Sequence, residues 1–140
     1  MRDAGVMLII KDGLILGISR RDDKTIFGLP GGKFDEAAGD QTPMDAAIRE
    51  TREETSVDVK KCIQLYKRVE PARNPGGEAF ECYCYYAQEW EGIPQNSEEG
   101  EVAWLTYEEL TTTKAAFPSY NIQTLKVFRQ LFPEVQLKGV

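Results

Sequence analysis

The alternation of apolar and polar positions predicts a chain that begins with strands. Ala4–Ile10 and Leu14–Ile18 are short apolar runs, and Lys11-Asp12-Gly13 separates them. Asp-Gly between two apolar segments is typical of a tight β-hairpin turn. Three later segments are rich in residues that favour strands, namely Lys60–Glu70, Ala79–Ala87 and Val102–Leu105. The loops Pro71–Gly77 and Glu91–Gly100 follow the first two of them.

The segment Ala79–Ala87 has the strongest strand pattern. Successive side chains of a strand point to opposite faces of the sheet. One face therefore carries Phe80, Cys82, Cys84 and Tyr86, and the other carries Glu81, Tyr83 and Tyr85. A face this rich in aromatic residues is most often part of a hydrophobic core.

Helical periodicity appears first after residue 42. Thr42 can cap a helix that starts at Pro43, and Asp45 then lies near the positive end of the helix dipole. Apolar positions recur from there at Met44, Ala47, Ile48 and Thr51.

Two more helices are expected near the C-terminus. Thr106-Tyr107-Glu108-Glu109 is a capping box that begins a brief helix ending near residues 111–113. Phe117-Pro118-Ser119 starts the last helix. Its apolar residues recur at helical spacing at Ile122, Leu125, Phe128, Leu131 and Phe132.

The predicted helix after Thr42 carries three carboxylates along one edge. Glu50, Glu53 and Glu54 have the spacing i, i+3, i+4. One interpretation is a solvated helix face supported by an Arg49–Glu53 pair. The helix is preceded, however, by Gly28-Leu29-Pro30-Gly31-Gly32, where the backbone can approach a ligand closely. Glycines followed by clustered carboxylates favour a hard-cation site for a phosphorylated ligand.

The segment Gly31–Val57 resembles the Nudix box, G-x5-E-x7-R-E-U-x-E-E-x-G-U with U aliphatic, which usually follows a Pro-Gly-Gly turn. Leu29-Pro30-Gly31-Gly32-Lys33 matches the turn, and Arg49–Val57 matches most of the helical half. There are four departures. Gln41 stands where the box has its first glutamate, so that this acid is missing unless Asp40 substitutes for it. The loop Phe34–Asp40 carries a three-residue insertion, Thr51 holds an aliphatic position, and Ser56 holds the glycine position.

The resemblance covers nearly the whole chain and implies an α/β (α+β) fold, the Nudix-type α-β-α sandwich with a mixed sheet, formed by residues 1–140 as a single domain. In this fold, an aromatic strand face such as that of Ala79–Ala87 can also line the nucleotide pocket.

The resemblance also implies site residues. Glu50, Glu53 and Glu54 would bind Mg²⁺ or Mn²⁺, with a backbone carbonyl near Gly31 or Gly32 completing the shell. Glu53 or Glu50 would take the proton from the attacking water, and Arg49 would orient a carboxylate. Lys33, with the two glycines, would lie at the substrate. The family often has a further acid on a late loop, and among Glu98, Glu99 and Glu101 we favour Glu101.

The charged loop Arg20–Lys24 has two interpretations. It is either an exposed connection or a segment that brings Arg20 or Arg21 to substrate phosphates.

The activity implied is hydrolysis of a nucleoside diphosphate linked to a group X. A nucleoside triphosphate or an oxidised nucleotide is the first expectation, and ADP-ribose, dinucleoside polyphosphates and RNA caps are alternatives. Two rivals remain: a non-catalytic Nudix-like module that senses a nucleotide, and an unrelated domain in which the acidic helix is a salt-bridged surface. Members of the Nudix family are often dimers, so the resemblance also leaves open that this chain forms a homodimer.

Composition narrows the classes of function. The net charge of −6 argues against broad binding to nucleic-acid polymers. The absence of histidine excludes Ser-His-Asp, Cys-His and His-ligated zinc chemistry. Cys62, Cys82 and Cys84 lack metal-site spacing and are expected to be free thiols. No apolar run approaches the length of a membrane span, and no signal-like start is present, which predicts a cytoplasmic protein.

Overall fold

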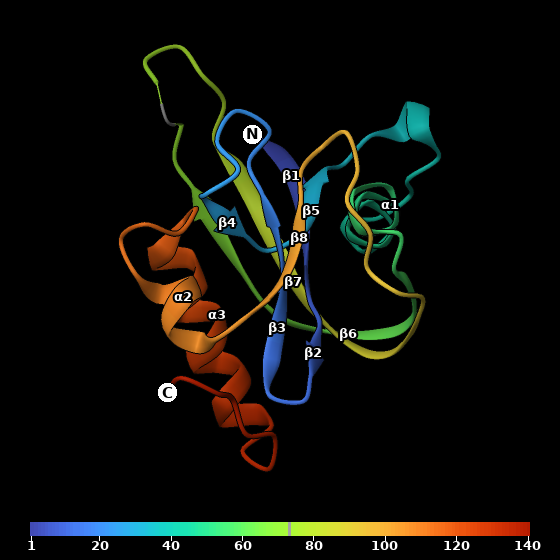
Figure 1. Ribbon diagram of the computed structural model, residues 1–140. Coiled ribbons are helices and arrows are strands. Elements are labelled where there is room, and N and C mark those ends of the chain that lie inside the picture. Colours follow the sequence, from blue (N-terminus) through green and yellow to red (C-terminus); the bar gives the residue numbers. More distant parts are fainter. Residues whose placement is uncertain (73) are drawn as a thin grey trace.

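Strands form a central layer between one helix on one side and two helices on the other (Figure 1). The computed structural model describes residues 1–72 and 74–140, so that Arg73 of the predicted loop Pro71–Gly77 lies outside the described residues. The strands are β1 (Arg2–Leu8), β2 (Ile10–Lys11), β3 (Leu14–Ser19), β4 (Phe27–Gly28), β5 (Gly31–Lys33), β6 (Asp58–Glu70), β7 (Phe80–Glu91) and β8 (Val102–Leu105). The helices are α1 (Pro43–Thr55), α2 (Tyr107–Thr111) and α3 (Pro118–Leu131), with a short 3₁₀ turn at Glu36–Ala38. The predicted mixed α+β sandwich is confirmed.

Two sheets make up the central layer. The first has the order β5-β1-β7-β6, in which β1 runs parallel to β7 and the other neighbours are antiparallel. In the second, β3 pairs with β2, β4 and β8. The hairpin turn has the expected chemistry, because Asp12 and Gly13 both adopt positive φ angles, 53° and 78°.

Helix α1 packs directly on the first sheet. A Cβ atom at Gly5 of β1 would overlap the carbonyl oxygen of Pro43 and lie 2.8 Å from Cβ of Ala47, so that only glycine permits this close approach. The core beneath the helix is apolar and includes Met7, Val57 and Tyr85. This packing fixes the helix that carries the three carboxylates relative to β1 and β5.

The ends of α1 follow from its sequence. Thr42 and Asp45 form a reciprocal capping box at the start. At the other end Ser56 adopts the left-handed conformation with φ of 65°, and its N–H donates to the carbonyl of Arg52. Ser56 therefore replaces the glycine that usually occupies such a cap.

Helix α3 covers the opposite face of the sheets, and its buried side differs from the prediction. Leu125 and Phe128 are buried as expected, whereas Ile122 and Leu131 are 44% and 55% exposed. Their places in the core are taken by Tyr120, Asn121 and Thr124. The polar pair is accommodated because Asn121 Nδ2 donates to the carbonyls of Leu110 and Ala116, and Thr124 Oγ1 is 2.7 Å from the Tyr66 hydroxyl.

The middle of β7 is covered on both faces. Tyr85 lies in the core under α1, while Tyr86 contacts the ring of Phe128 on α3 with centroids 4.8 Å apart. The predicted assignment of residues to alternate faces is correct, and the strand extends to Glu91, past the predicted end at Ala87.

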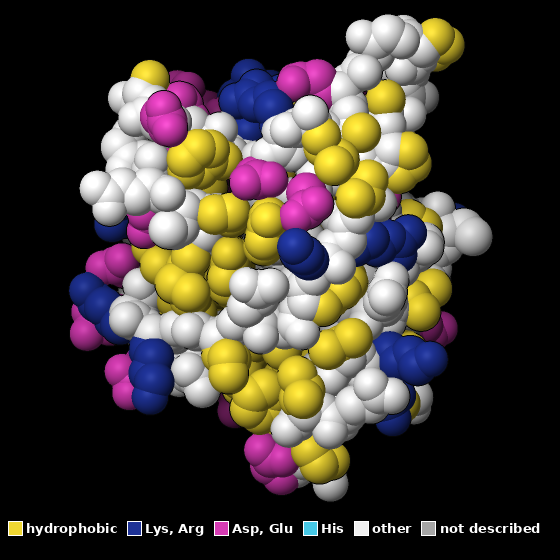
Figure 2. All heavy atoms as spheres, turned by 180° about the vertical axis from the view of Figure 1, so that it is seen from behind, with side chains coloured by type: hydrophobic (Ala, Val, Ile, Leu, Met, Phe, Trp, Pro, Cys, Tyr) yellow, Lys and Arg dark blue, Asp and Glu magenta, His cyan; other side chains and the backbone are white. Residues whose placement is uncertain are grey.

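The surface is mixed in character. Figure 2 shows basic and acidic side chains interspersed around hydrophobic atoms, without a continuous basic area among the described residues on that face. In the described ranges no helix combines the length and the apolar character that a membrane span needs.

Candidate active site

The edge strand β5 forms the backbone of the candidate site. It pairs with β1, with Gly31 opposite Val6 and Gly32 opposite Gly5. A Cβ atom at Gly31 would overlap the backbone of Gly5, and one at Gly32 would lie 2.5 Å from the carboxyl carbon of Glu50. Contact with the backbone of β1 therefore requires glycine at position 31, whereas a side chain at position 32 would displace the carboxylate of Glu50.

Glu54 is the most enclosed of the three carboxylates in the predicted metal site. Its Oε1 accepts a 2.9 Å hydrogen bond from the N–H of Gly31, which ties the end of α1 to β5. Burial raises the pKa of Glu54 to about 8, and the charges of Glu50, Glu99 and Glu53 act in the same direction. The site therefore favours an added positive charge, whether a proton or a cation.

Glu50 lies one turn earlier on α1, against Gly32. Burial raises its pKa, while the hydrogen bond from Arg49 opposes that shift. The nearby charges of Glu53 and Glu99 raise it further. Glu53 is the most exposed of the three, at 54% of its side chain.

Arg49 connects the acidic residues to the inserted loop. Its Nη1 lies 3.0 Å from Glu50 Oε1 and 3.2 Å from Glu53 Oε2, and its Nη2 donates to the carbonyl of Lys33. The remaining guanidinium face pairs with Asp40, with Nε–Oδ1 at 3.0 Å and Nη2–Oδ2 at 2.8 Å. These contacts raise the pKa of Arg49, and the same bond lowers the pKa of Asp40. Arg49 is thus held in one orientation beside Glu50 and Glu53.

Asp40, rather than Gln41, pairs with Arg49 of the box. The Asp40 side chain is only 2% exposed and also accepts the N–H of Asp35 at 3.0 Å. Gln41 is exposed, and its backbone N–H donates to Asp45. The inserted loop therefore presents its buried acid one residue earlier than the box would place it.

The late loop brings Glu99, rather than Glu101, towards the carboxylates of α1. The charge of Glu99 raises the pKa of both Glu50 and Glu54. Glu99 is itself paired with Arg21. Glu101, the acid favoured from sequence, has its carboxylate 3.6 Å from Lys24. The pKa values of Glu50 and Glu54 therefore respond to Glu99, and the choice of the additional acid between Glu99 and Glu101 stays a prediction.

The substrate-binding residues expected from sequence separate into two groups. Gly31, Gly32 and Lys33 line a pocket of about 550 Å³, and the Lys33 ammonium lies 5.5 Å from the ring centroid of Phe80. Arg20 lies elsewhere, in a bidentate pair with Asp22 at 2.9 and 2.7 Å. The structure therefore does not bring Arg20 to this pocket.

We call this cavity the β5 pocket. It lies on the face of the first sheet that α3 covers, so that β5 stands between it and α1. Its walls are largely apolar and aromatic, and the residues that matter below are Val6, Leu29, Phe80, Phe117 and Tyr120, with Glu70 and Asn121 among the polar ones. The sequence did not predict that Phe117, Tyr120 and Asn121, at the start of α3, line this pocket. Helical periodicity shows which residues share a helix face, but not which cavity that face borders.

The donor set fits a hard divalent cation in its chemistry. Glu50, Glu53 and Glu54 supply carboxylate oxygens, and the backbone of Gly32 is adjacent to Glu50. In the described part of the chain no three acidic, cysteine or histidine side chains converge closely enough to form a metal site as they stand. Arg49 Nη1 lies between Glu50 and Glu53 and bonds both, so that cation binding at this pair requires these side chains to rearrange.

Comparison with known proteins agrees with this geometry. The model of the NUDIX domain matches residues 1–126. The chain belongs to the NUDIX family. This membership supports a pyrophosphohydrolase activity in general, and NUDIX hydrolases generally need divalent metals such as Mg²⁺. Comparison with curated protein sequences gave no match.

Solved structures share the NUDIX fold at low sequence identity. The Escherichia coli ORF135 protein is 22% identical, with a TM-score of 0.74 over 94% of this chain and 90% of that one. A MutT NUDIX hydrolase from Burkholderia pseudomallei is 24% identical, with a TM-score of 0.71 over 89% and 97%. The NUDIX domain of Shewanella oneidensis NrtR, crystallised with ADP ribose, is 22% identical, with a TM-score of 0.70 over 93% and 86%.

Proposed function

We propose that this NUDIX protein is a Mg²⁺- or Mn²⁺-dependent pyrophosphohydrolase that cleaves a nucleoside diphosphate linked to a group X, with a nucleoside triphosphate or an oxidised nucleotide as the first candidate. One observation carries the proposal. The acidic edge of α1 faces β5, and the other side of β5 lines an aromatic pocket. A diphosphate that crosses β5 has its charged part at the carboxylates and its base in the pocket.

The residues have separable roles in this proposal. Glu50, Glu53 and Glu54 hold the metal, which when bound neutralises diphosphate charge and lowers the pKa of a bound water. Arg49, fixed by Asp40, orients Glu50 and Glu53. Glu53 or Glu50 accepts the proton of the attacking water. Glu99, which pairs with Arg21, raises the pKa of Glu50 and Glu54 by its charge.

The β5 pocket would receive the base. Phe80 and Tyr120 offer aromatic surface, and Lys33 lies beside Phe80 at the C-terminal end of β5. The volume of about 550 Å³ is in the range of small-molecule pockets.

ADP-ribose is a second candidate because a domain of the same fold, the NrtR NUDIX domain, is crystallised with it. The two candidates differ in products. A nucleoside triphosphate would give a monophosphate and pyrophosphate, whereas ADP-ribose would give AMP and a sugar phosphate.

The test is turnover of a substrate panel with Mg²⁺ and with EDTA, analysed by separation of the products. The panel contains dNTPs, 8-oxo-dGTP, ADP-ribose and diadenosine polyphosphates. Glu53→Gln is expected to lower kcat at least a hundredfold, equivalent to about 3 kcal/mol in the barrier. Glu89→Gln is the matched control, because Glu89 is exposed on β7 away from the site and is expected to leave kcat unchanged.

Equal turnover of wild type and Glu53→Gln would contradict the catalytic assignment. Saturable binding of a nucleotide without turnover by the wild type would instead identify a nucleotide sensor.

A further inference from the structure

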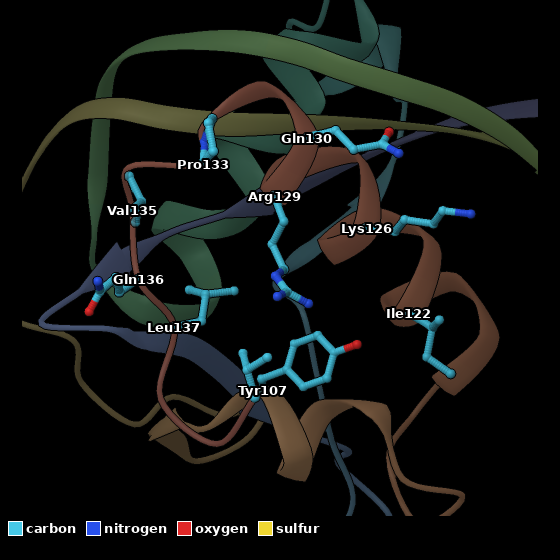
Figure 3. A pocket seen from close by; sticks show the side chains of 10 residues that line it. Tyr107, Ile122, Lys126, Arg129, Gln130, Pro133, Val135, Gln136 and Leu137 are labelled. Carbon is cyan, nitrogen blue, oxygen red and sulfur yellow. The ribbon is translucent and has the colours of Figure 1, made fainter.

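A second pocket lies at the other end of α3, between that helix, the start of α2 and the C-terminal tail (Figure 3). Its volume is about 610 Å³. Its walls are built mainly by Tyr107, Ile122, Lys126, Arg129, Val135 and Leu137, none of which borders the β5 pocket. We call it the tail pocket.

The wall formed by the tail is held in place. Val135 and Leu137 pack against the buried cluster that contains Phe128. The N–H of Lys138 donates to the carbonyl of Gly13 in the β2–β3 turn, and the N–H of Tyr107 donates to the carbonyl of Lys138, both at 2.9 Å. The tail therefore bridges the hairpin and α2, which makes the pocket a fixed feature of the fold.

Arg129 is the central charge of the tail pocket. Its guanidinium carbon lies 5.7 Å from the ring centroid of Tyr107. Figure 3 shows it extending from α3 towards Tyr107, whereas the side chain of Lys126, one turn earlier on the same helix, extends in another direction from the rim of the cavity. Within residues 1–72 and 74–140, no carboxylate lies within 4 Å of either cation. Two unpaired cations at one cavity are notable in a chain of net charge −6.

A purely structural role would place these cations at the C-terminal end of α3 to compensate the helix dipole. In that role Arg129 would bond the free carbonyls of the last turn. Among the described residues Arg129 makes no such hydrogen bond, and its side chain lies against an aromatic ring instead. The dipole accounts for a cation at this position but not for its orientation into a cavity.

We propose that the tail pocket binds a phosphate monoester of a planar group, with a nucleoside monophosphate as the representative ligand. A phosphate monoester carries between one and two negative charges at neutral pH, which Arg129 would bind and which Lys126 would reach by rotation of its flexible side chain. The ring of Tyr107 and the side chains of Val135 and Leu137 offer surface for a planar group. This inference is independent of the proposed hydrolase activity, because it uses no residue of the β5 pocket or of α1.

Titration of the full chain with AMP in EDTA, followed by calorimetry and by NMR, tests the proposal. Phenyl phosphate, inorganic phosphate and adenosine are titrated in parallel to separate the contributions of ring and phosphate. We expect AMP and phenyl phosphate to bind more tightly than phosphate or adenosine. The variant Arg129→Gln/Lys126→Gln should weaken AMP binding at least tenfold, and Tyr107→Leu should weaken AMP more than inorganic phosphate.

The matched control is Lys61→Gln, which removes one exposed positive charge on β6 at a residue that does not line this pocket. It should change the Kd of AMP by less than twofold. Circular dichroism and the thermal midpoint check that every variant is folded, and Arg129→Lys provides a milder second variant. The proposal is overturned if AMP shows no saturable binding, or if AMP binds equally well to the folded double variant, which would assign binding to the β5 pocket.

Discussion

The buried pair of Asp40 and Arg49 gives the sharpest prediction about the inserted loop. Asp40→Asn keeps the shape of the side chain and removes its charge, so that Arg49 loses one bidentate partner. Removing one partner of a buried ion pair costs about 3–5 kcal/mol when the other charge is left without compensation. Arg49 is 15% exposed and keeps Glu50 and Glu53, so that we expect a loss of about 2 kcal/mol in the free energy of unfolding.

The assay is urea unfolding of the metal-free protein followed by circular dichroism. A loss of about 2 kcal/mol corresponds to a thermal midpoint lower by about 6 °C for a chain of this size. Asp58→Asn is the control, because it removes a carboxylate from solvent-accessible pairs with Lys60 and Arg52 and should cost less than about 1 kcal/mol. A second variant, Asp40→Asn/Gln41→Glu, restores an acid at the usual box position.

We expect that the second variant is not rescued, since Gln41 is exposed whereas Asp40 is buried against Arg49. Asp40→Asn should also lower kcat, because Glu50 and Glu53 lose the fixed orientation of Arg49. The reasoning is refuted if Asp40→Asn is as stable as the Asp58→Asn control, or if Gln41→Glu restores stability to the Asp40 variant.

Three further predictions concern α1 and its C-terminal end. Thr51→Val should stabilise the protein by about 1 kcal/mol, because Thr51 Oγ1 is buried with no hydrogen-bond partner among the described residues. Thr55→Val should destabilise it by about 1–2 kcal/mol, because Thr55 Oγ1 donates to the carbonyl of Thr51 and accepts the N–H of Val57. Equal effects of the two substitutions in urea unfolding would contradict this prediction. Ser56→Gly should raise the thermal midpoint by relieving about 1 kcal/mol at φ of 65°, and an unchanged or lower midpoint would count against it. Burial raises the pKa of Glu54 to about 8, so that the folded state keeps a proton that the unfolded state releases near pH 4.5. The free energy of unfolding of the metal-free protein should therefore fall as the pH rises from about 5 to 8. Glu54→Gln should remove much of that fall, and the same slope in both proteins would contradict the shift.

The sequence was sufficient where local rules decide the structure. Asp12-Gly13 specified the hairpin, and Thr42-Pro43 with Asp45 specified the start of α1, because both depend on the conformations of a few adjacent residues. The carboxylates of α1 could be predicted to share an edge for the same reason.

Other features depend on contacts between distant segments and were not predictable. The predicted buried face of α3 was partly wrong because Asn121 and Thr124 form hydrogen bonds that permit polar residues in the core. The choice between Glu99 and Glu101 depends on the shape of the late loop, in which the Ser19 hydroxyl accepts the N–H of Glu101 and Arg21 pairs with Glu99, and it stays a prediction. From the sequence, Asp40 was only a possible substitute for the missing box glutamate. The insertion in the loop Phe34–Asp40 changes which residue reaches Arg49, and the spacing of the motif does not show which one it is.

Manganese binding tests the central claim, that the acidic edge of α1 holds a divalent cation, most directly. Titration of Mn²⁺ into the protein, with free Mn²⁺ measured by electron paramagnetic resonance, should show saturable binding that Glu50→Gln and Glu54→Gln each weaken at least tenfold. Glu89→Gln should bind Mn²⁺ as the wild type does. Equal binding by all four proteins, or no binding by the wild type with or without nucleotide, would contradict the account.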